Sequence, residues 1–217
     1  MSANDASKAT APKRALVVID AQNEYFSGQL LIEYPDPQHS INNIGLAMDA
    51  ARAAGVPVLV IQHTSPAGAP VFQKGEPAWE LHDAVKNRQH DYRVEKTMPS
   101  IFAGTDAAAW LKQKGIDTLS IVGYMTQNCN ASTIYQAMHD GYKVEMLSDA
   151  TGAVPYANTA GSATAEEIHR VLSVIFHSNF AAVTSTAGWI AAVNAGEALA
   201  KDNVLASNKA ARNSSRA

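Results

Sequence analysis

Three side chains in this sequence are of the types that acyl-transfer chemistry needs: a carboxylate, an ammonium and the chain's single thiol. They are Asp20, Lys96 and Cys129. A thiolate is a strong nucleophile, a carboxylate can take the thiol proton, and a nearby cation stabilises the sulfur anion. Each residue alone also has an ordinary structural reading, as a turn cap, a solvated lysine or a buried apolar thiol. A catalytic reading therefore depends on whether the fold brings the three together.

The positions of these residues along the chain predict that the fold brings them together. Asp20 follows the apolar run ALVVI, and Lys96 follows the short run RVE. Cys129 comes soon after the run TLSIV, where a helix is predicted to begin. In open α/β sheets, active sites form at the carboxyl ends of the strands. An acid, a base and a thiol at the equivalent ends of three strands therefore predict one active site.

The segment before Cys129 predicts an activated thiol. Thr126 is the expected N-cap of a helix, which places Cys129 at the third helical position. Unpaired backbone N–H groups and the positive end of the helix dipole stabilise a thiolate there, and so does a nearby ammonium. The carboxylate of Asp20 opposes this effect. We expect the cationic influences to prevail and to hold the pKa of Cys129 below the usual value of about 8.5.

Short apolar runs alternate with segments of helical period over most of the chain, which predicts a parallel sheet with helices on both faces. The predicted strands are 15–19, 57–61, 93–95, 118–122, 144–147 and 181–183. The predicted helices are 41–54, 106–114, 127–139, 165–177 and 187–199. Gly55, Gly115 and Gly141 stand just past three of these helices, where a left-handed residue commonly ends a helix.

The length of 217 residues fits one domain with one sizeable core. We expect this domain at 14–200, between an N-terminal arm at 1–13 and a polar C-terminal tail at 201–217, both without periodicity. The segment 62–92 contains several Pro and Gly residues and is too irregular for a plain connection. Such long loops usually act as lids or control specificity.

The composition is that of a globular protein. Apolar residues make up 47% of the chain and charged residues 17%, with a net charge of −3. The basic residues are scattered, so we expect no nucleic-acid partner. The sequence has no signal-peptide core and no span of apolar residues long enough for a bilayer, so we expect a cytoplasmic protein without a membrane partner. A single cysteine excludes an internal disulfide.

Three ordered motifs resemble the isochorismatase-like hydrolase superfamily, which includes nicotinamidases and N-carbamoylsarcosine amidase. They are VVIDAQNEYF around Asp20, EKTMPSIF beginning beside Lys96, and GYMTQNC ending at Cys129. The similarity runs from Arg14 to Val183. It implies an α/β fold, a three-layer α/β/α sandwich with a six-stranded parallel sheet, and a homo-oligomer. It also implies that Cys129 is the nucleophile, Asp20 the general base and Lys96 the third member of the triad.

The resemblance implies two backbone features beside the nucleophile. One is a non-proline cis peptide between Tyr124 and Met125. The other is an oxyanion hole, in which the backbone N–H groups of Met125 and Cys129 bind the oxygen that becomes negative during attack.

Four further side chains are candidates for substrate binding: Gln22, Phe26, His63 and Trp79. Gln22 could instead hydrogen-bond the triad or a turn, and His63 is equally well read as a structural histidine. The two aromatic residues could wall the pocket, although aromatics more often serve packing. Trp79 ranks above Phe26 because it lies in the long loop.

Two departures from the superfamily pattern narrow the chemistry. Metal-dependent nicotinamidases carry an Asp-x-His element and a further histidine, whereas the comparable region here reads EYPDPQHS, with Asp36 and His39 spaced differently. We therefore expect no metal and no other cofactor. Isochorismatases proper lack the catalytic cysteine, because vinyl-ether hydrolysis needs acid catalysis rather than a thiol. Cys129 argues against that reaction.

The sequence thus predicts a cysteine hydrolase that cleaves a C–N bond of a small amide-like substrate through a thioester. Two alternatives stay open: a hydrolase of vinyl ethers or other non-amide substrates, and a non-catalytic member that serves in binding or assembly. The three intact reactive residues favour an enzyme over the last of these.

Overall fold

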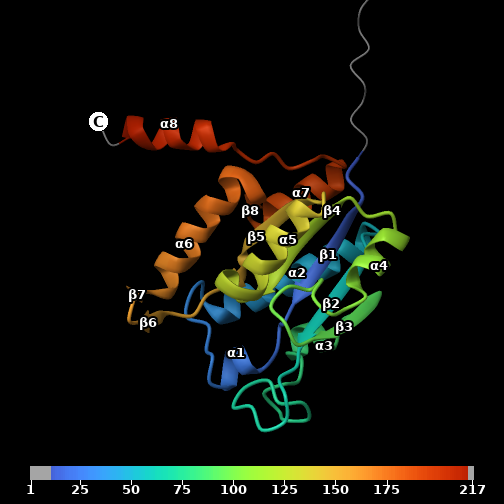
Figure 1. The fold of residues 1–217 in the computed structure, drawn as a ribbon. Coiled ribbons are helices and arrows are strands. Elements are labelled where there is room, and N and C mark those ends of the chain that lie inside the picture. Colours follow the sequence, from blue (N-terminus) through green and yellow to red (C-terminus); the bar gives the residue numbers. More distant parts are fainter. Residues whose placement is uncertain (1–10, 215–217) are drawn as a thin grey trace, which may run out of the picture.

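The computed structural model describes residues 11–214 and contains a central six-stranded sheet in the order β3-β2-β1-β4-β5-β8 (Figure 1). The strands are β1 (Arg14–Ile19), β2 (Val58–His63), β3 (Tyr92–Lys96), β4 (Thr118–Tyr124), β5 (Lys143–Gly152) and β8 (Ala182–Thr184). Every neighbouring pair is parallel. Parallel neighbours need crossover connections, which here contain the helices. The predicted six-stranded α/β/α sandwich is confirmed.

Helices cover both faces of this sheet, and the last helix of the chain projects from the body. They are α1 (Glu24–Ser27), α2 (Pro37–Ala53), α3 (Asp83–Lys86), α4 (Ala107–Gln113), α5 (Ala131–His139), α6 (Ala165–Ile175), α7 (Thr186–Ala195) and α8 (Val204–Ser214). Two π-helical turns, η1 (Thr126–Asn130) and η2 (Phe176–Phe180), precede α5 and follow α6. Gly55, Gly115 and Gly141 have φ angles of 68°, 66° and 91°, as their places after predicted helices indicated.

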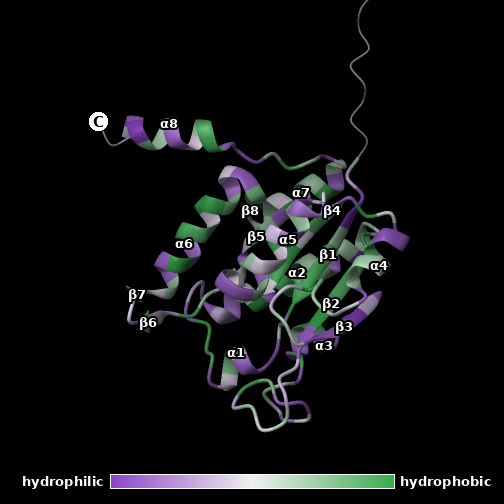
Figure 2. Cartoon of the chain, viewed as in Figure 1, coloured by the Kyte–Doolittle hydropathy of each residue, from purple (hydrophilic) through white to green (hydrophobic). Residues whose placement is uncertain are grey.

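The residues of β1 alternate between two hydrophobic cores. Leu16 and Val18 pack in the core that α2 and α7 cover. Ala15, Val17 and Ile19 pack in the core that α4 and α5 cover. Figure 2 shows the strands as a largely hydrophobic layer between the helices. Because both faces are buried, the strand is a continuous apolar run rather than an alternating one.

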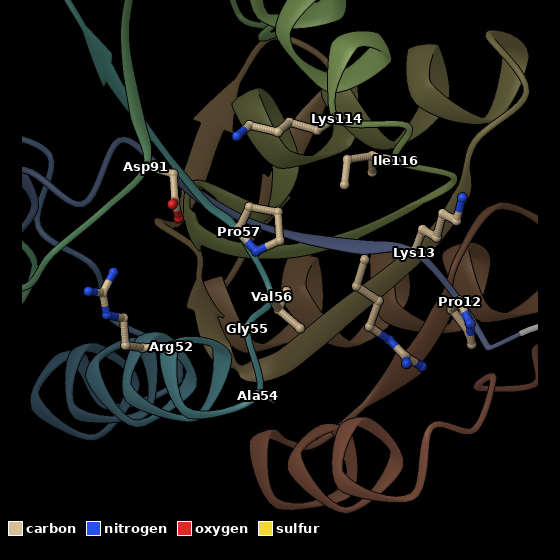
Figure 3. Close-up of a pocket in the computed structure, with 11 residues that line it drawn as sticks. Pro12, Lys13, Arg52, Ala54, Gly55, Val56, Pro57, Asp91, Lys114 and Ile116 are labelled. Carbon is tan, nitrogen blue, oxygen red and sulfur yellow. The ribbon is translucent and has the colours of Figure 1, made fainter.

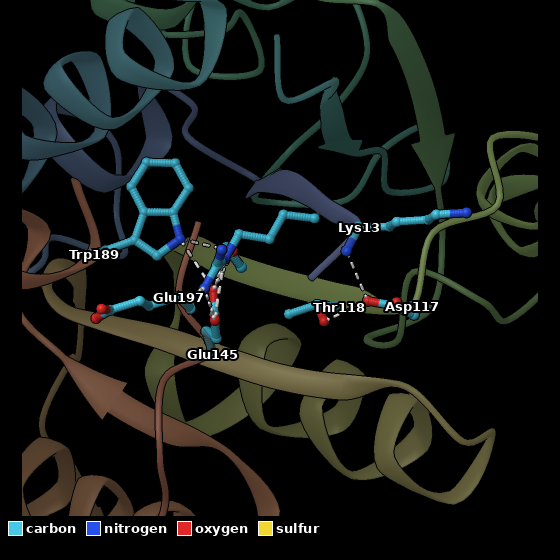
Figure 4. A network of polar contacts seen from close by, with 8 residues as sticks. Lys13, Asp117, Thr118, Glu145, Trp189 and Glu197 are labelled. Carbon is cyan, nitrogen blue, oxygen red and sulfur yellow. Dashed lines mark hydrogen bonds and ion pairs between the residues drawn. The ribbon is translucent and has the colours of Figure 1, made fainter. Parts of the chain in front are cut away.

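A buried polar network ties the amino ends of three strands to α7 (Figure 4). The guanidinium of Arg14 on β1 donates to the carboxylate of Glu145 on β5, with an N–O distance of 2.8 Å. Glu145 also accepts from the hydroxyl of Ser120 at 2.7 Å and from the indole N–H of Trp189 at 3.1 Å. Each buried charge thus has a partner of opposite charge and further hydrogen bonds, which offsets the cost of its desolvation. The network fixes the amino ends of these strands, which lie away from the predicted active site.

Two segments depart from the sequence predictions. The expected C-terminal tail contains the helix α8, because the side chain of Asn203 caps it by accepting from the N–H of Ala206 at 2.9 Å. A small hairpin of β6 (Tyr156–Asn158) and β7 (Gly161–Ala163) was not predicted. Most of the expected N-terminal arm, residues 1–10, lies outside the described residues. Across 11–214, none of the helices has the length and apolar character needed to cross a bilayer.

Candidate active site

The fold brings Asp20, Lys96 and Cys129 into direct contact at the carboxyl edge of the sheet. Lys96 Nζ lies 2.7 Å from Asp20 Oδ2 and 3.2 Å from Cys129 Sγ. The side chains of Asp20 and Lys96 are fully buried, and Cys129 is 4% exposed. A buried ion pair in contact with the chain's single thiol has the composition of a nucleophilic site.

The strand order explains why a lysine fills the central position. β3 lies two strands from β1, a separation of about 10 Å, which only a long side chain can span. The strand between them, β2, ends at His63, the register partner of Lys96. Lys96 therefore passes beside His63, and its Nζ lies 3.2 Å from His63 Nδ1. The ammonium thus forms an ion pair with the carboxylate of Asp20 and donates hydrogen bonds toward the thiol of Cys129 and the imidazole of His63.

The backbone beside Asp20 has a conformation that few residues tolerate. Asp20 has a φ angle of 49°, in the left-handed region, where Asp and Asn are enriched among residues other than Gly. On β4, Gly123 is the register partner of the preceding residue, Ile19. Gly123 has a φ angle of 104°, and a Cβ there would lie 2.0 Å from the carbonyl oxygen of Ile19. Only glycine fits at this position. The two adjacent strand ends therefore approach more closely than ordinary side chains permit.

Cys129 lies within the π-helical turn η1, a local form that is frequent at functional sites. The carbonyl of Met125 accepts from the N–H groups of Asn128 and Asn130, each at 3.1 Å. The side-chain amide of Asn130 donates to the carbonyl of Gly123 at 2.9 Å, which ties the turn to β4. The peptide bond between Tyr124 and Met125 is cis, at the position where one was expected.

The expected capping role of Thr126 is wrong. Its hydroxyl makes no cap but lies 3.0 Å from Nδ1 of the buried His169 on α6. Because a π-helical turn stands where an α-helical first turn was expected, the capping geometry does not form. Thr126 instead joins the turn that contains Cys129 to α6. Sequence reasoning missed His169, and the only signal for it was a histidine within an otherwise amphipathic helix.

The expectation of a lowered thiol pKa is also wrong. Burial raises the pKa of Cys129, and the charge of Asp20 and a hydrogen bond to it raise it further. Lys96 lowers it, but by less. Burial also opposes the charge of Lys96, yet Asp20 and Cys129 outweigh burial and hold the pKa of Lys96 above its usual value. The resting site therefore contains a neutral thiol beside an Asp–Lys ion pair.

Two of the four substrate-binding candidates have their polar groups engaged by the protein itself. Gln22 is buried; its amide donates to the carbonyls of His63 and Trp79 and accepts from the N–H of His63 at 2.8 Å. The indole N–H of Trp79 donates to Thr64 at 2.9 Å. Gln22 thus clamps the long loop to β2, and Trp79 packs in the core beneath that loop. The polar groups of Gln22 and Trp79 are thus engaged within the protein, and a part for either residue in substrate binding stays a prediction.

The other two candidates lie in an aromatic cluster. The ring of Phe26 packs edge-on to that of Tyr124, and the ring of His63 packs edge-on to that of Phe72 from the long loop. Tyr25, which sequence reasoning passed over, contacts both Tyr124 and Phe72. Burial, then the charges of Cys129 and Asp20, raise the pKa of Tyr25 well above its ordinary value. Its position directly after the DAQNE motif was the available signal.

The only metal-type donor cluster among the described residues coincides with the triad. Donor atoms of Asp20, His63 and Cys129 lie within 4.8 Å of one another. Lys96 contacts all three of these groups, so an ammonium already occupies their centre. Asp36 caps α2 by accepting from the N–H of His39 at 2.8 Å. These residues do not fit a bound metal ion while Lys96 is charged.

A cavity of about 780 Å³ lies at the amino ends of the strands, opposite the candidate active site (Figure 3). Its lining includes Lys13, Pro57 and Ile116, which lead into the amino ends of β1, β2 and β4. It contains none of the candidate catalytic groups. Because ligands of open parallel sheets bind at the carboxyl ends of the strands, this cavity is not the active site.

The six-stranded parallel sheet with a buried acid–ammonium–thiol cluster at its carboxyl edge places the chain in the class of isochorismatase-like α/β proteins. The family model for the isochorismatase domain matches residues 14–187. The chain belongs to the isochorismatase family of hydrolases.

Known relatives support the same assignment. A solved isochorismatase-type structure from Burkholderia xenovorans is 58% identical, with a TM-score of 0.95, and the match covers 96% of this chain and 100% of that one. A secreted isochorismatase effector of Verticillium dahliae is 34% identical over 67% of this chain and 76% of its own length. The ureidoacrylate amidohydrolase of Agrobacterium fabrum is 30% identical over 63% of this chain and 75% of its own length.

Proposed function

We propose that this chain is a cysteine-dependent amidohydrolase that cleaves a C–N bond of a small amide-like substrate through a thioester on Cys129. The observation that carries this proposal is the contact of Lys96 with both Asp20 and Cys129, at 2.7 Å and 3.2 Å. A metal-free acyl transfer needs a nucleophile, a base and a cation in mutual contact, and these are the three groups present. The near-complete burial of Cys129 favours a small substrate.

In the proposed first half-reaction, Asp20 takes the proton of the Cys129 thiol as the sulfur attacks the carbonyl carbon of the substrate. Lys96 stabilises the negative charge on the sulfur before the new C–S bond forms. The tetrahedral intermediate then collapses, the C–N bond breaks, and Asp20 returns the proton to the departing nitrogen. The products of this step are an amine or ammonia and a thioester.

In the second half-reaction, Asp20 removes a proton from water, which attacks the thioester carbonyl. The C–S bond breaks, the carboxylic acid leaves, and the proton returns to the sulfur of Cys129. We assign the oxyanion hole to the backbone N–H groups of Met125 and Cys129, because N–H groups at the start of a helical turn lack partners within it. No external oxidant, reductant or cofactor enters the balance.

Vinyl-ether hydrolysis is the second candidate, and the similarity to an isochorismatase effector favours it. That reaction proceeds by protonation and has no step for a nucleophilic thiol. The contact between Lys96 and Cys129 serves thiol chemistry and therefore favours the amidase. A panel of small amides and vinyl ethers, with detection of released ammonia, distinguishes the two reactions.

The proposal is tested by intact mass spectrometry of the protein after brief mixing with a panel of small amides and quenching in acid. We expect a mass gain equal to the acyl group, located on the peptide that contains Cys129 and absent from Cys129→Ala. A substrate that is hydrolysed by the wild type and equally by Cys129→Ala would overturn the proposal.

A further inference from the structure

The C-terminal helix α8 projects from the body of its own chain (Figure 1). None of its residues is buried, and its two largest apolar side chains, Val204 and Leu205, are 62% and 63% exposed. A helix of eleven residues is marginal in water unless it packs against another surface. Among the described residues, α8 approaches its own body mainly at η2, near the root of the helix. Its own chain therefore supplies little of the packing that would stabilise it.

The root of α8 is fixed by specific hydrogen bonds. The backbone N–H of Asp202 donates to the carbonyl of His177 at 3.0 Å. The Asp202 carboxylate accepts from the hydroxyl of Ser207 at 2.6 Å, and Asn203 caps the first turn. These bonds set where the helix starts and in which direction it leaves the body. We call residues 203–214 the arm. Hydrogen bonds at its start thus attach the arm to the body in a defined direction.

A second exposed apolar surface lies on α6. Val174 and Ile175 follow Val171 by three and four residues, so both are its neighbours on one face of the helix. Val174 is 62% exposed. Figure 2 shows hydrophobic and hydrophilic residues alternating along this helix. A capping box between Thr164 and Glu167 stabilises the N-terminus of this helix. An apolar stripe on a rigid surface helix is typical of an interface.

We propose that the arm of one copy packs on the α6 stripe of a second copy, and that the reciprocal contact closes a two-fold dimer. An isologous interface requires two complementary surfaces on the same chain, which the arm and the stripe provide. The two helices each have eleven residues. This proposal concerns assembly and does not rest on the proposed function.

Charge complementarity sets the expected direction of this packing. The arm carries Lys209 and Arg212 and has no acidic residue, whereas the first turn of α6 carries Glu166 and Glu167. With the two helices antiparallel, the start of the arm meets the end of α6. Leu205 then lies against the apolar stripe, and the basic end of the arm lies beside the acidic first turn of α6.

The Burkholderia xenovorans structure supports the arm as an ordered element. The match leaves 4% of the 217 residues uncovered, about nine residues, fewer than the eleven of α8. The match therefore extends into the arm in a protein that is 58% identical. The start of the arm thus has a counterpart in a solved relative.

The oligomeric state of the full chain tests the proposal by sedimentation velocity. We expect a dimer for the wild type and a monomer for Leu205→Asp and for Val174→Asp, because each places a charge in the proposed apolar contact. Leu46→Asp, an equivalent change at a 53% exposed leucine on α2, should stay dimeric. Circular dichroism melting confirms that each variant is folded. A monomeric wild type, or a dimer that survives both interface changes, would overturn the proposal.

Cross-linking tests the exchange itself. Leu205→Cys and Val174→Cys are made in separate chains, each with Cys129→Ala, and the two proteins are mixed and mildly oxidised. We expect a disulfide-linked heterodimer from the mixture and little linked product from either protein alone. A product formed equally by one variant on its own would place the arm against another surface and would refute the assignment to α6.

Discussion

Lys96 donates a hydrogen bond to Nδ1 of His63 over 3.2 Å, between two residues that are register partners on neighbouring strands. Because Nδ1 accepts, the single proton of the neutral imidazole lies on Nε2. Burial, and then the positive charge of Lys96, lower the pKa of His63 from 6.5. His63 thus holds the ammonium in place, but only while its ring is neutral. We therefore expect His63 to act through Lys96, as a positioning residue.

The first prediction is that turnover depends on the neutral form of His63. Protonation makes Nδ1 a donor and puts a second cation beside Lys96, so kcat/KM should fall as the pH drops through the lowered pKa of His63. His63→Phe removes the acceptor and should reduce kcat/KM about ten- to hundredfold, the range expected for a hydrogen bond to a charged group. His63→Gln retains a hydrogen-bond acceptor and should be far more active than His63→Phe.

The pH profile separates this role from simple packing. In His63→Gln, the acid limb of kcat/KM should move to lower pH, because the titrating ring is gone. An acid limb that is unchanged in this variant would show that another group titrates and that His63 does not control Lys96.

The second prediction concerns the triad. Cys129→Ala should abolish hydrolysis and still fold, because it leaves the Asp20–Lys96 pair intact. Asp20→Asn and Lys96→Ala should each lower kcat by orders of magnitude, and each leaves a buried charge unpaired, at a cost of about 3–5 kcal/mol of stability. The double variant Asp20→Asn/Lys96→Met removes both charges, so it should recover stability but not activity. Wild-type turnover by Cys129→Ala would exclude the mechanism.

The sequence alone predicted the sheet and the convergence of the triad because both follow from strand ends. Apolar runs locate the strands, and the parallel arrangement places Asp20 and Lys96 at one edge. It could not predict the sign of the pKa shift at Cys129. Burial is a tertiary property, and the helix-end argument assumed a solvated thiol. The same limit applies to Gln22, whose amide is bonded to a loop forty and more residues away.

Local signals also failed where the helix geometry is irregular. The π-helical turn at 126–130 has the same residue types as an α-helical first turn, so the sequence predicts a cap at Thr126. Its true partner, His169, lies 43 residues away on α6. The arm was missed for a different reason. Its sequence is polar and short, and only the cap at Asn203 indicated a helix.

The third prediction is that hydrolysis does not require a metal. Lys96 occupies the centre of the Asp20–His63–Cys129 donor cluster, so activity should survive exhaustive dialysis against a chelator. Elemental analysis of the purified protein should find less than stoichiometric zinc and iron. Activity that is lost on chelation and restored by either ion would show that a metal displaces the ammonium.

The fourth prediction links His169 to stability at acidic pH. Burial lowers the pKa of His169 from 6.5 to about 4, although a hydrogen bond to the backbone of Ser148 opposes this. Because the folded-state pKa is depressed, the unfolded chain takes up the proton first. The contribution of neutral His169 to the unfolding free energy is therefore complete above pH 6.5 and is lost as the pH falls toward 4. Each unit of difference between the folded and unfolded pKa corresponds to about 1.36 kcal/mol, so the loss of unfolding free energy is on the order of 3 kcal/mol.

Urea unfolding at several pH values checks this prediction. The difference in unfolding free energy between the wild type and His169→Gln should shrink as the pH falls from 6.5 to 4. His90→Gln, at an exposed histidine, serves as the matched control and should follow the wild type. A constant difference between the wild type and His169→Gln across this range would show that His169 does not titrate as described.

The fifth prediction concerns the reactivity of Cys129. Its raised pKa means that the resting thiol is neutral at neutral pH, so iodoacetamide should label it more slowly than it labels a free thiol. The two neighbours act in opposite directions. Asp20→Asn removes the carboxylate that raises the pKa and should accelerate labelling, although hydrolysis is lost. Lys96→Ala removes the stabilising ammonium and should slow labelling further.

Labelling rates measured against pH for the three proteins decide this point. The combination expected for Asp20→Asn, faster alkylation with abolished turnover, separates a base from a residue that only maintains the fold. A damaged site would also expose the thiol, so the melting temperature of Asp20→Asn must show a folded protein during the measurement. If Asp20→Asn were labelled no faster than the wild type while still folded, its carboxylate would not hold the thiol proton, and another group would have to act as the base.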